Sequence, residues 1–259
     1  MNNTLVKGLG ILEVLARSPQ PVGITEIATR ERLLKSDVHR LVQSLVDLGY
    51  VRQERASGAY FATVRLWELG FAVMGKTDIR KIAEPWMARL LDQTRETVHL
   101  SVLDRVDAVY IHKLESPEPV RAYSEVGGRA PAHAVATGKA LLANQTDNEQ
   151  REAARQLRRF TPRTIVDPEE FLRELARIRS QGYAINRGEW RETVCGVAAA
   201  ILDPAGETIA AIGISGPAER VRPARLRELA RLVVDAAAAV NRSLNGDEQA
   251  RPRPRRLAA

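Results

Sequence analysis

The first 65 residues contain three segments in which hydrophobic positions recur with the 3.6-residue period of an α-helix. The apolar positions of the first segment, TLVKGLGILEVLAR, are expected to share one buried helical face and consist of Leu5, Leu9, Leu12 and Ala16. After the breaker SPQPVG, a short second helix is expected from about Ile24 to Arg30, with Thr25 as its N-cap. Two helices joined by a tight connection are therefore predicted before residue 31.

The third segment, KSDVHRLVQSLVDLG, has the most regular pattern. Its predicted buried stripe consists of Val38, Leu41, Val42, Leu45 and Val46. Ser36 is expected to cap the start of this helix, and Gly49 suits the position just after its end. The following stretch, YVRQERASGAYFAT, predicts a β-hairpin that turns at Ser57 and Gly58. This order of elements predicts a winged helix-turn-helix domain over residues 1–65.

The solvent face of the third helix carries side chains that suit DNA. A recognition helix places mainly its N-terminal half in the major groove, which favours contacts from Ser36, His39, Arg40 and Gln43. Arg52 and Arg55 on the hairpin would then contact phosphates. The alternative is that these side chains only solvate a surface helix, as the polar face of any amphipathic helix does.

From residue 66 onward, helical and strand patterns are mixed. A linker helix is expected over 66–78, followed by a helical stretch in which Pro85 either starts a new segment or introduces a kink. Period-two patterns predict hairpins from 98–103 with 108–114 and from 194–203 with 208–216. Helices are expected at about 137–143, 147–158, 168–181 and 223–243. The fold class is therefore α+β, with an antiparallel sheet flanked by helices and a cavity on one face.

The chain resembles the isocitrate-lyase-regulator (IclR) family of transcription regulators over about residues 4–243. The motifs that carry the resemblance are Lys35, Ser36 and Arg40, then Gly49-Tyr50-Val51 and Tyr60, GGRAPAHAVATGKALLA, SQGYAINRGEW and VCGVAAAILDPAGETIAAIGISGP. The resemblance implies a GAF-like effector-binding domain at 79–245, a homodimer or tetramer, and double-stranded operator DNA as a partner. The expected DNA-contacting residues are Thr25, Lys35, Ser36, His39, Arg40, Gln43, Arg52 and Arg55.

The resemblance also implies an effector pocket. Its residues would be Ala136, Thr137, Gly138, Asn186, Cys195, Gly196, Gly213 and Ser215. The unpaired amides at the start of the helix after Val135 would hold a carboxylate. The family's acidic position falls on Asn186, its cysteine position on Gly196, and its paired serines on Gly213 and Ser215. The missing polar groups favour an aromatic or hydrophobic acid over a small keto acid. Asn186 could instead be a turn residue and Cys195 a small core residue.

Composition narrows the class of protein further. The net charge of +7 suits a polyanionic partner, although four arginines lie in the basic tail 246–259, which is expected to be disordered. One cysteine and four scattered histidines predict no disulfide, no metal site and a cytoplasmic protein. No signal peptide, membrane span or cofactor is expected.

Two other functions compete with a ligand-controlled regulator. An enzyme is not expected, because HAVATGKA lacks the first glycine and the hydroxyl residue of a phosphate-binding loop and GISGP lacks the second glycine of a nucleophile elbow. A DNA-binding dimer without a ligand is the second alternative. It would need no large sheet domain with an anion site, and no metabolite would both stabilise it and weaken its binding to DNA.

Overall fold

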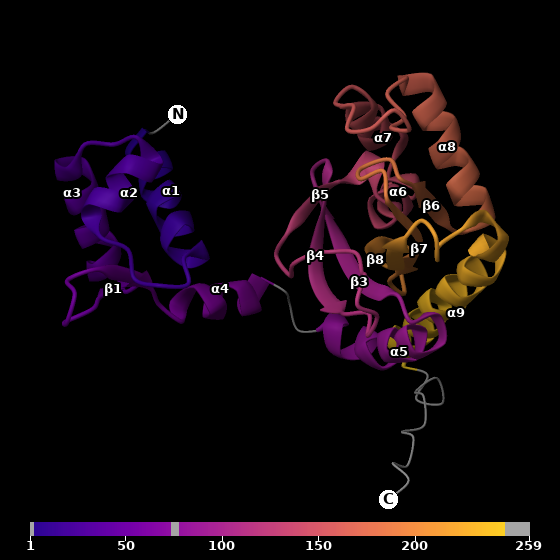
Figure 1. The fold of residues 1–259 in the computed structure, drawn as a ribbon, viewed down its shortest axis with the longest axis horizontal. Coiled ribbons are helices and arrows are strands. Elements are labelled where there is room, and N and C mark those ends of the chain that lie inside the picture. Colours follow the sequence, from indigo (N-terminus) through magenta and orange to yellow (C-terminus); the bar gives the residue numbers. More distant parts are fainter. Residues whose placement is uncertain (1–2, 74–77, 247–259) are drawn as a thin grey trace, which may run out of the picture. The chain divides into compact units, whose positions relative to one another are not determined.

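The computed structural model describes residues 3–73 and 78–246, and the chain divides into two compact units, Met1–Asp78 and Ile79–Ala259 (Figure 1). The N-terminal unit is a winged helix-turn-helix, as the hydrophobic periodicity predicts. Its elements are α1 (Asn3–Arg17), α2 (Ile24–Glu31), α3 (Lys35–Asp47), β1 (Val51–Gln53), β2 (Tyr60–Ala62) and α4 (Arg65–Val73). Strands β1 and β2 pair antiparallel and form the wing.

The buried face of α1 differs from the predicted one. Ile11 and Leu15 are buried in the core of this unit, whereas Leu5 and Leu9 are exposed. The predicted and the observed buried positions are both compatible with a helical period. Packing against the other helices of this unit determines which face of α1 is buried. Gly10 lies against the Glu31 side chain, so this side of α1 faces the end of α2.

Two predicted helix caps are also wrong. Helix α2 begins one residue before Thr25, with Gly23 as its N-cap, and α3 begins at Lys35 with Leu34 as its N-cap. Thr25 and Ser36 therefore lie inside their helices. The end of α3 is as predicted, because Gly49 adopts a φ of +79°, which a glycine tolerates without strain.

The C-terminal unit is an α+β domain built on one six-stranded antiparallel sheet in the order β5-β4-β3-β8-β7-β6. Its strands are β3 (Thr97–Asp104), β4 (Asp107–Leu114), β5 (Arg129–Pro131), β6 (Ala184–Arg187), β7 (Val194–Leu202) and β8 (Thr208–Pro217). Its helices are α5 (Ile79–Thr94), α6 (Ala136–Ala143), α7 (Asp147–Ala154), α8 (Pro168–Gln181) and α9 (Leu226–Leu244), with short 3₁₀ turns at Ala132–Ala134 and Pro223–Arg225. Both predicted hairpins are present.

Helices cover both faces of the sheet and create two cores. Figure 1 shows α5 and α9 side by side on one face, and their core includes Val197, Ile201 and Val233. On the other face α6, α7 and α8 pack together around Leu141 and Phe171. Successive residues of β7 point alternately into these two cores. Both faces of the strand are therefore buried, which explains why it is apolar almost throughout.

Several elements of the C-terminal unit differ from those predicted from the sequence. Strands β5 and β6 were not predicted, because segments of three or four residues carry too little periodicity. Helix α5 is one helix that contains Pro85 rather than two segments, and α7 ends at Ala154. The predicted linker helix corresponds to α4, and residues 74–77 and the basic tail from 247 lie outside the described residues.

Candidate functional site

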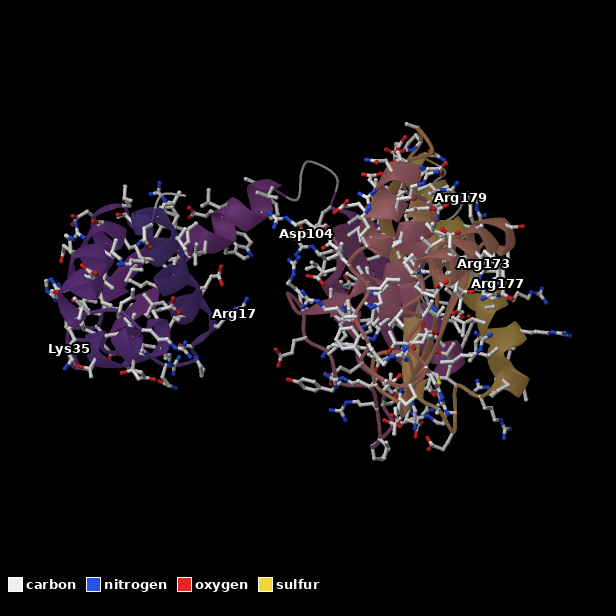
Figure 2. All side chains as sticks on the ribbon, turned by 90° about the horizontal axis from the view of Figure 1, so that it is seen from above. Arg17, Lys35, Asp104, Arg173, Arg177 and Arg179 are labelled. Carbon is white, nitrogen blue, oxygen red and sulfur yellow. The ribbon has the colours of Figure 1, made fainter. Side chains whose placement is uncertain are left out.

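The outer face of α3 is a surface of polar and basic side chains. Packing of Val38, Leu41 and Val42 into the core fixes which side of the helix is outward. The residues on the exposed side are Lys35, Ser36, His39, Arg40 and Gln43. Figure 2 shows Lys35 at the periphery of its domain, with the side chain directed away from the ribbon. All five predicted contacts of this helix are therefore free to meet another molecule.

Two of these side chains are held by short-range contacts. The Arg40 guanidinium lies 3.6 Å from Asp37, and Asp37 also accepts a hydrogen bond of 3.2 Å from Lys7 of α1. The Arg40 side chain is nevertheless 72% exposed, so this pair leaves it accessible. Gln43 donates to Asp47 at 3.0 Å. Such exposed pairs are weak and can be exchanged for contacts to phosphates or bases.

The wing adds a second basic surface. Arg52 on β1 and Arg55 in the connecting turn are both exposed, and Thr25 on α2 is exposed as well. The turn is ordered by Gln53, whose amide donates to the Gly58 carbonyl at 2.8 Å, while Gly58 has a φ of +71°. A rigid basic wing beside an exposed helix face suits a DNA duplex better than a small ligand.

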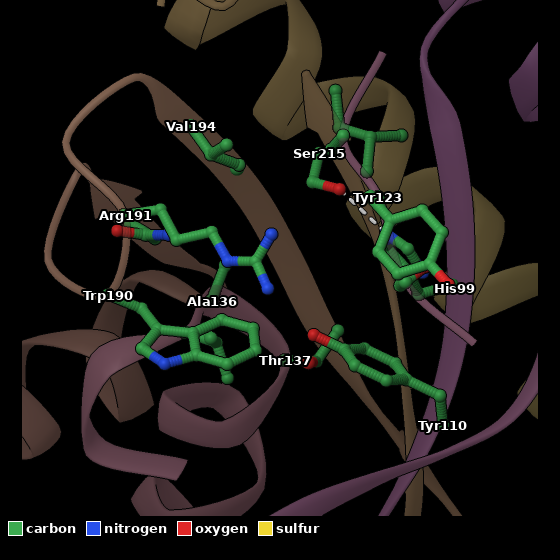
Figure 3. A pocket seen from close by; sticks show the side chains of 15 residues that line it. His99, Tyr110, Tyr123, Ala136, Thr137, Trp190, Arg191, Val194 and Ser215 are labelled. Carbon is green, nitrogen blue, oxygen red and sulfur yellow. Dashed lines mark hydrogen bonds between the residues drawn. The ribbon is translucent and has the colours of Figure 1, made fainter. Parts of the chain in front are cut away.

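The C-terminal unit contains a pocket at the sheet face covered by α6 (Figure 3). The empty space between its walls is about 490 Å³, a figure that includes the open mouth. Strands β3, β4, β7 and β8 form its floor, the first turn of α6 one wall, and the loop after β6 another. The lining residues are His99, Tyr110, Ala122, Tyr123, Ser124, Val135, Ala136, Thr137, Asn186, Trp190, Arg191, Val194, Gly196, Ile214 and Ser215.

One end of this pocket is cationic. Figure 3 shows the Arg191 side chain reaching over Trp190 into the pocket, with the hydroxyl groups of Tyr110 and Thr137 on the opposite side. The guanidinium carbon of Arg191 lies 4.8 Å from the centroid of the Trp190 ring. Burial raises the pKa of Tyr110 to about 12, so its hydroxyl stays protonated and can donate a hydrogen bond. No aspartate or glutamate is among the described residues that line the pocket.

His99, Ser124 and Ser215 form a group of uncharged polar side chains in the pocket, and the Lys113 ammonium donates to the Ser124 carbonyl at 2.7 Å. His99 Nε2 lies 2.6 Å from the Ser215 hydroxyl oxygen, and His99 Nδ1 lies 3.4 Å from that of Ser124. Burial, reinforced by the positive charge of Lys113, lowers the pKa of His99 to about 3. The imidazole is therefore neutral near pH 7, with one nitrogen donating and the other accepting.

Five of the eight predicted pocket residues line this cavity: Ala136, Thr137, Asn186, Gly196 and Ser215. At the start of α6, Val135 provides no side-chain cap, so the amides of the first turn have no partner from a capping side chain. Asn186 is buried in β6, and its side-chain oxygen also accepts a hydrogen bond of 2.8 Å from the Glu189 amide across the bend at Gly188, so it lines the pocket and orders this bend as well.

Gly138, Cys195 and Gly213 do not line the cavity, contrary to expectation. A Cβ on Gly138 would lie 2.3 Å from the backbone of Ala132, so this glycine permits close packing of α6. A Cβ on Gly213 would lie 2.6 Å from that of Ala198, so this glycine permits close packing of β8 against β7. Cys195 points to the other side of β7, where it belongs to the core formed by α5 and α9. Burial raises the pKa of its thiol.

The main residues that sequence reasoning missed are His99, Tyr110, Trp190 and Arg191. Strand alternation offers a signal for the first two, since each lies on a strand position that faces α6 rather than α5. Trp190 and Arg191 follow a short strand that was not predicted, so nothing local indicates that their loop folds over the cavity. Arg191 is the most informative of the four because it determines the charge of the site.

A buried ion cluster ties two walls of the pocket together. Lys139 of α6 is fully buried and donates to both carboxylate oxygens of Glu189, at 2.8 and 2.7 Å. Glu174 of α8 lies 3.5 Å from the same ammonium. Glu189 directly precedes Trp190 and Arg191, so this pair fixes their loop to the helix whose first turn lines the pocket. Lys139 is thus structural, unlike the lysine of a phosphate-binding loop.

The described residues contain no metal-binding cluster of acidic, histidine or cysteine side chains and no helix able to cross a membrane. The two recognisable surfaces are the basic face of α3 with the wing and the pocket of the C-terminal unit. An exposed helix-and-wing face together with a separate closed sheet domain is typical of regulators that bind DNA with one domain and a small molecule with another.

Comparison with known proteins agrees with this division. Residues 4–55 match the IclR helix-turn-helix domain and residues 71–242 match the bacterial transcriptional regulator IclR C-terminal domain. The HTH-type transcriptional regulator KdgR of Dickeya chrysanthemi is 39% identical over 220 residues, which cover 84% of this chain and 72% of that protein. The transcriptional repressor IclR of Escherichia coli K12 is 31% identical over 247 residues, which cover 94% and 90% of the two chains.

A solved structure shows the same architecture. An IclR homolog from Microbacterium hydrocarbonoxydans, crystallised in complex with 4-hydroxybenzoate, superimposes with a TM-score of 0.82. It is 27% identical, and the match covers 94% of this chain and 100% of that one. These matches confirm the predicted α+β fold, the winged helix-turn-helix and the absence of an enzymatic role in the family. The chain belongs to the IclR family of bacterial transcriptional regulators.

Proposed function

We propose that this regulator is a repressor whose binding to operator DNA is controlled by a carboxylic acid in the pocket of the C-terminal unit. The similarity to the IclR repressor of Escherichia coli supports repression as the mode of action. The face that would bind DNA consists of Lys35, Ser36, His39, Arg40 and Gln43 on α3, with Thr25, Arg52 and Arg55 beside it.

The observation that carries the ligand proposal is the unpaired charge of Arg191. Within residues 3–73 and 78–246, no carboxylate lies within ion-pair distance of its guanidinium, although the side chain reaches into a pocket. An anion that enters would meet Arg191, the Tyr110 hydroxyl and the amides at the start of α6. Charge-assisted hydrogen bonds of this kind are the strong ones in proteins.

The shape of the pocket favours an acid with a flat, apolar body. The walls include the rings of Trp190, Tyr110 and Tyr123, and Gly196 on the floor adds no side chain to the cavity. The complex of the Microbacterium relative with 4-hydroxybenzoate supports an aromatic carboxylate as the ligand class.

A second copy of this chain is the proposed protein partner, in a homodimer or a dimer of dimers. Helix α4 buries none of its side chains within its own unit, and its Trp67 and Val73 side chains are 66% and 84% exposed. Leu5 and Leu9 form an exposed apolar face on α1. The two winged helix-turn-helix domains of a dimer would bind two half-sites on one face of the DNA. A coupling free energy of about 1–3 kcal/mol between ligand binding and DNA binding would change operator affinity about 5–150-fold.

Substitution of Arg191 by alanine tests the ligand proposal. Losing a charged hydrogen-bond donor is expected to weaken binding of benzoate and 4-hydroxybenzoate about 10–100-fold. Calorimetric titration measures this directly. Arg173, an exposed arginine on α8 outside the pocket, provides the matched control Arg173→Ala, which should bind like the unchanged protein. Equal affinities of the Arg191→Ala variant and the unchanged protein for both acids would exclude Arg191 as the carboxylate site.

A further inference from the structure

A second cavity of the C-terminal unit opens beside β6, the edge strand of the sheet, and is called the edge groove below. Arg163 and Arg187 line it, together with an apolar surface that consists of Cys195, Ala218, Val221, Pro223 and Leu226. Asn186 lines both this groove and the pocket of Figure 3. Because Arg187 and its strand partner Cys195 point away from the face that Asn186 lines, the two cavities lie on opposite faces of the same sheet edge.

The loop that carries Arg163 is fixed against the bend that follows β6. The Thr161 hydroxyl donates to the Gly188 carbonyl at 2.8 Å and accepts from the Arg163 amide at 3.1 Å. The Arg163 guanidinium itself donates to the Arg187 carbonyl at 3.3 Å. The backbone positions of both arginines are therefore set before any ligand binds, which lowers the entropy cost of binding one there.

The edge groove has an excess of positive charge. Within residues 3–73 and 78–246, neither guanidinium lies within ion-pair distance of a carboxylate. Burial raises the pKa of the Cys195 thiol, and the positive charges of Arg163 and Arg187 act against this shift. The negative charges of Glu189 and Glu219 raise the pKa further. Glu189 belongs to the buried ion cluster and is matched there, so of these two carboxylates only Glu219 opposes the two guanidinium groups.

Two guanidinium groups in one groove suit a ligand group with several charged oxygens. Arginine binds phosphate through two parallel N–H donors, and a phosphate monoester carries about −1.5 to −2 charges near pH 7. A free inorganic ion would leave the apolar lining exposed to water, whereas an organic body attached to the phosphate would cover it. The combination of charge and apolar surface therefore favours a phosphate monoester with an apolar body.

We infer that the edge groove is a second small-molecule site, in which Arg163 and Arg187 bind the phosphate of such a monoester. The inference goes beyond the proposed function, because neither arginine takes part in holding a carboxylic acid in the pocket of Figure 3. The shared wall at Asn186 makes the two sites neighbours without making them one site.

Calorimetric titration of the full-length protein with phenyl phosphate tests the inference. Phenyl phosphate is expected to bind about 10-fold more tightly than inorganic phosphate, which lacks the apolar body, or phenol, which lacks the charge. Arg163→Ala combined with Arg187→Ala should weaken its binding about 10–100-fold. The matched control is Arg151→Ala combined with Arg173→Ala, which removes two exposed arginines of α7 and α8 and should have an effect of less than about 2-fold.

Replacement of Glu219 by glutamine gives a test that a damaged fold cannot imitate. The substitution removes the charge that opposes the two arginines, so phenyl phosphate should bind about 2–5-fold more tightly. An affinity that stays the same or falls would contradict the assignment of the phosphate to this groove.

The Arg191→Ala variant separates this inference from the proposed function. It should leave unchanged the binding of phenyl phosphate that depends on Arg163 and Arg187, while the binding of benzoate is weakened. Loss of phenyl phosphate binding in Arg191→Ala would place the phosphate in the other pocket and overturn the second site. The second site would also be overturned if phenyl phosphate did not bind at millimolar concentration, or if it bound equally to the Arg163→Ala, Arg187→Ala variant. None of these results affects the proposed function, which is tested with benzoate and 4-hydroxybenzoate.

Discussion

Replacement of Lys139 by methionine is expected to destabilise the C-terminal unit by about 3–5 kcal/mol. Among the described residues, Lys139 is the only cationic side chain that pairs with Glu189, and the substitution removes its charge. Glu189 is almost fully buried, so its carboxylate would be left without a counter-charge in a poorly solvated site. Breaking one partner of a buried pair costs far more than the intact pair contributes, because the remaining charge stays desolvated.

Chemical denaturation followed by tryptophan fluorescence measures this effect. Trp86 and Trp190 report on the C-terminal unit, and Trp67 reports on the N-terminal unit. Arg177→Met is the matched control, because Arg177 pairs with Glu174 of the same cluster at 2.6 Å but is nearly half exposed. It should cost less than about 1 kcal/mol. The double variant Lys139→Met with Glu189→Met should recover much of the loss. A Lys139→Met variant as stable as the control would show that the buried pair is not required for stability.

Replacement of Arg40 by alanine is expected to weaken operator binding about 10–100-fold, the usual range for a lost charged contact. If Arg40 contacts a phosphate, the slope of log K against log salt should also become shallower by about 0.9. Fluorescence anisotropy with labelled operator at several salt concentrations measures both quantities. Arg17→Ala carries the same charge change at the end of α1, outside the proposed DNA face, and should have a much smaller effect. An unchanged slope for Arg40→Ala would exclude a phosphate contact by this residue.

The elements with long, regular patterns could be predicted from the sequence. Helix α3 is an example, because its stripe from Val38 to Val46 has one orientation that buries it. The buried face of helix α1 could not be predicted in this way, since Leu5 and Leu9 fit a helical face as well as Ile11 and Leu15 do. Only the contact with the other helices decides which face is buried. Helix starts are uncertain for a similar reason: a serine or threonine near the end is no guarantee that its side chain caps the helix.

The pocket could be predicted where it follows from strand and helix order, and not where it depends on a loop. Ala136 on α6 and Ser215 on β8 lie on elements that the family resemblance implies. Gly213 was expected beside Ser215, but close packing against Ala198 leaves no space for a ligand there. Arg191 reaches the cavity because Glu189 is bound to Lys139, a contact that spans 50 residues of sequence. No local pattern reveals such a contact.

Binding to the DNA just upstream of its own gene, measured with and without a panel of carboxylic acids, tests the central claim most directly. We expect salt-dependent, specific binding that at least one carboxylic acid alters, and loss of that response in the Arg191→Ala variant while binding to the DNA is kept. Specific binding that no acid alters would favour a ligand-independent DNA-binding dimer. The absence of any specific binding to that DNA would contradict the proposal that the protein regulates transcription from the DNA upstream of its own gene.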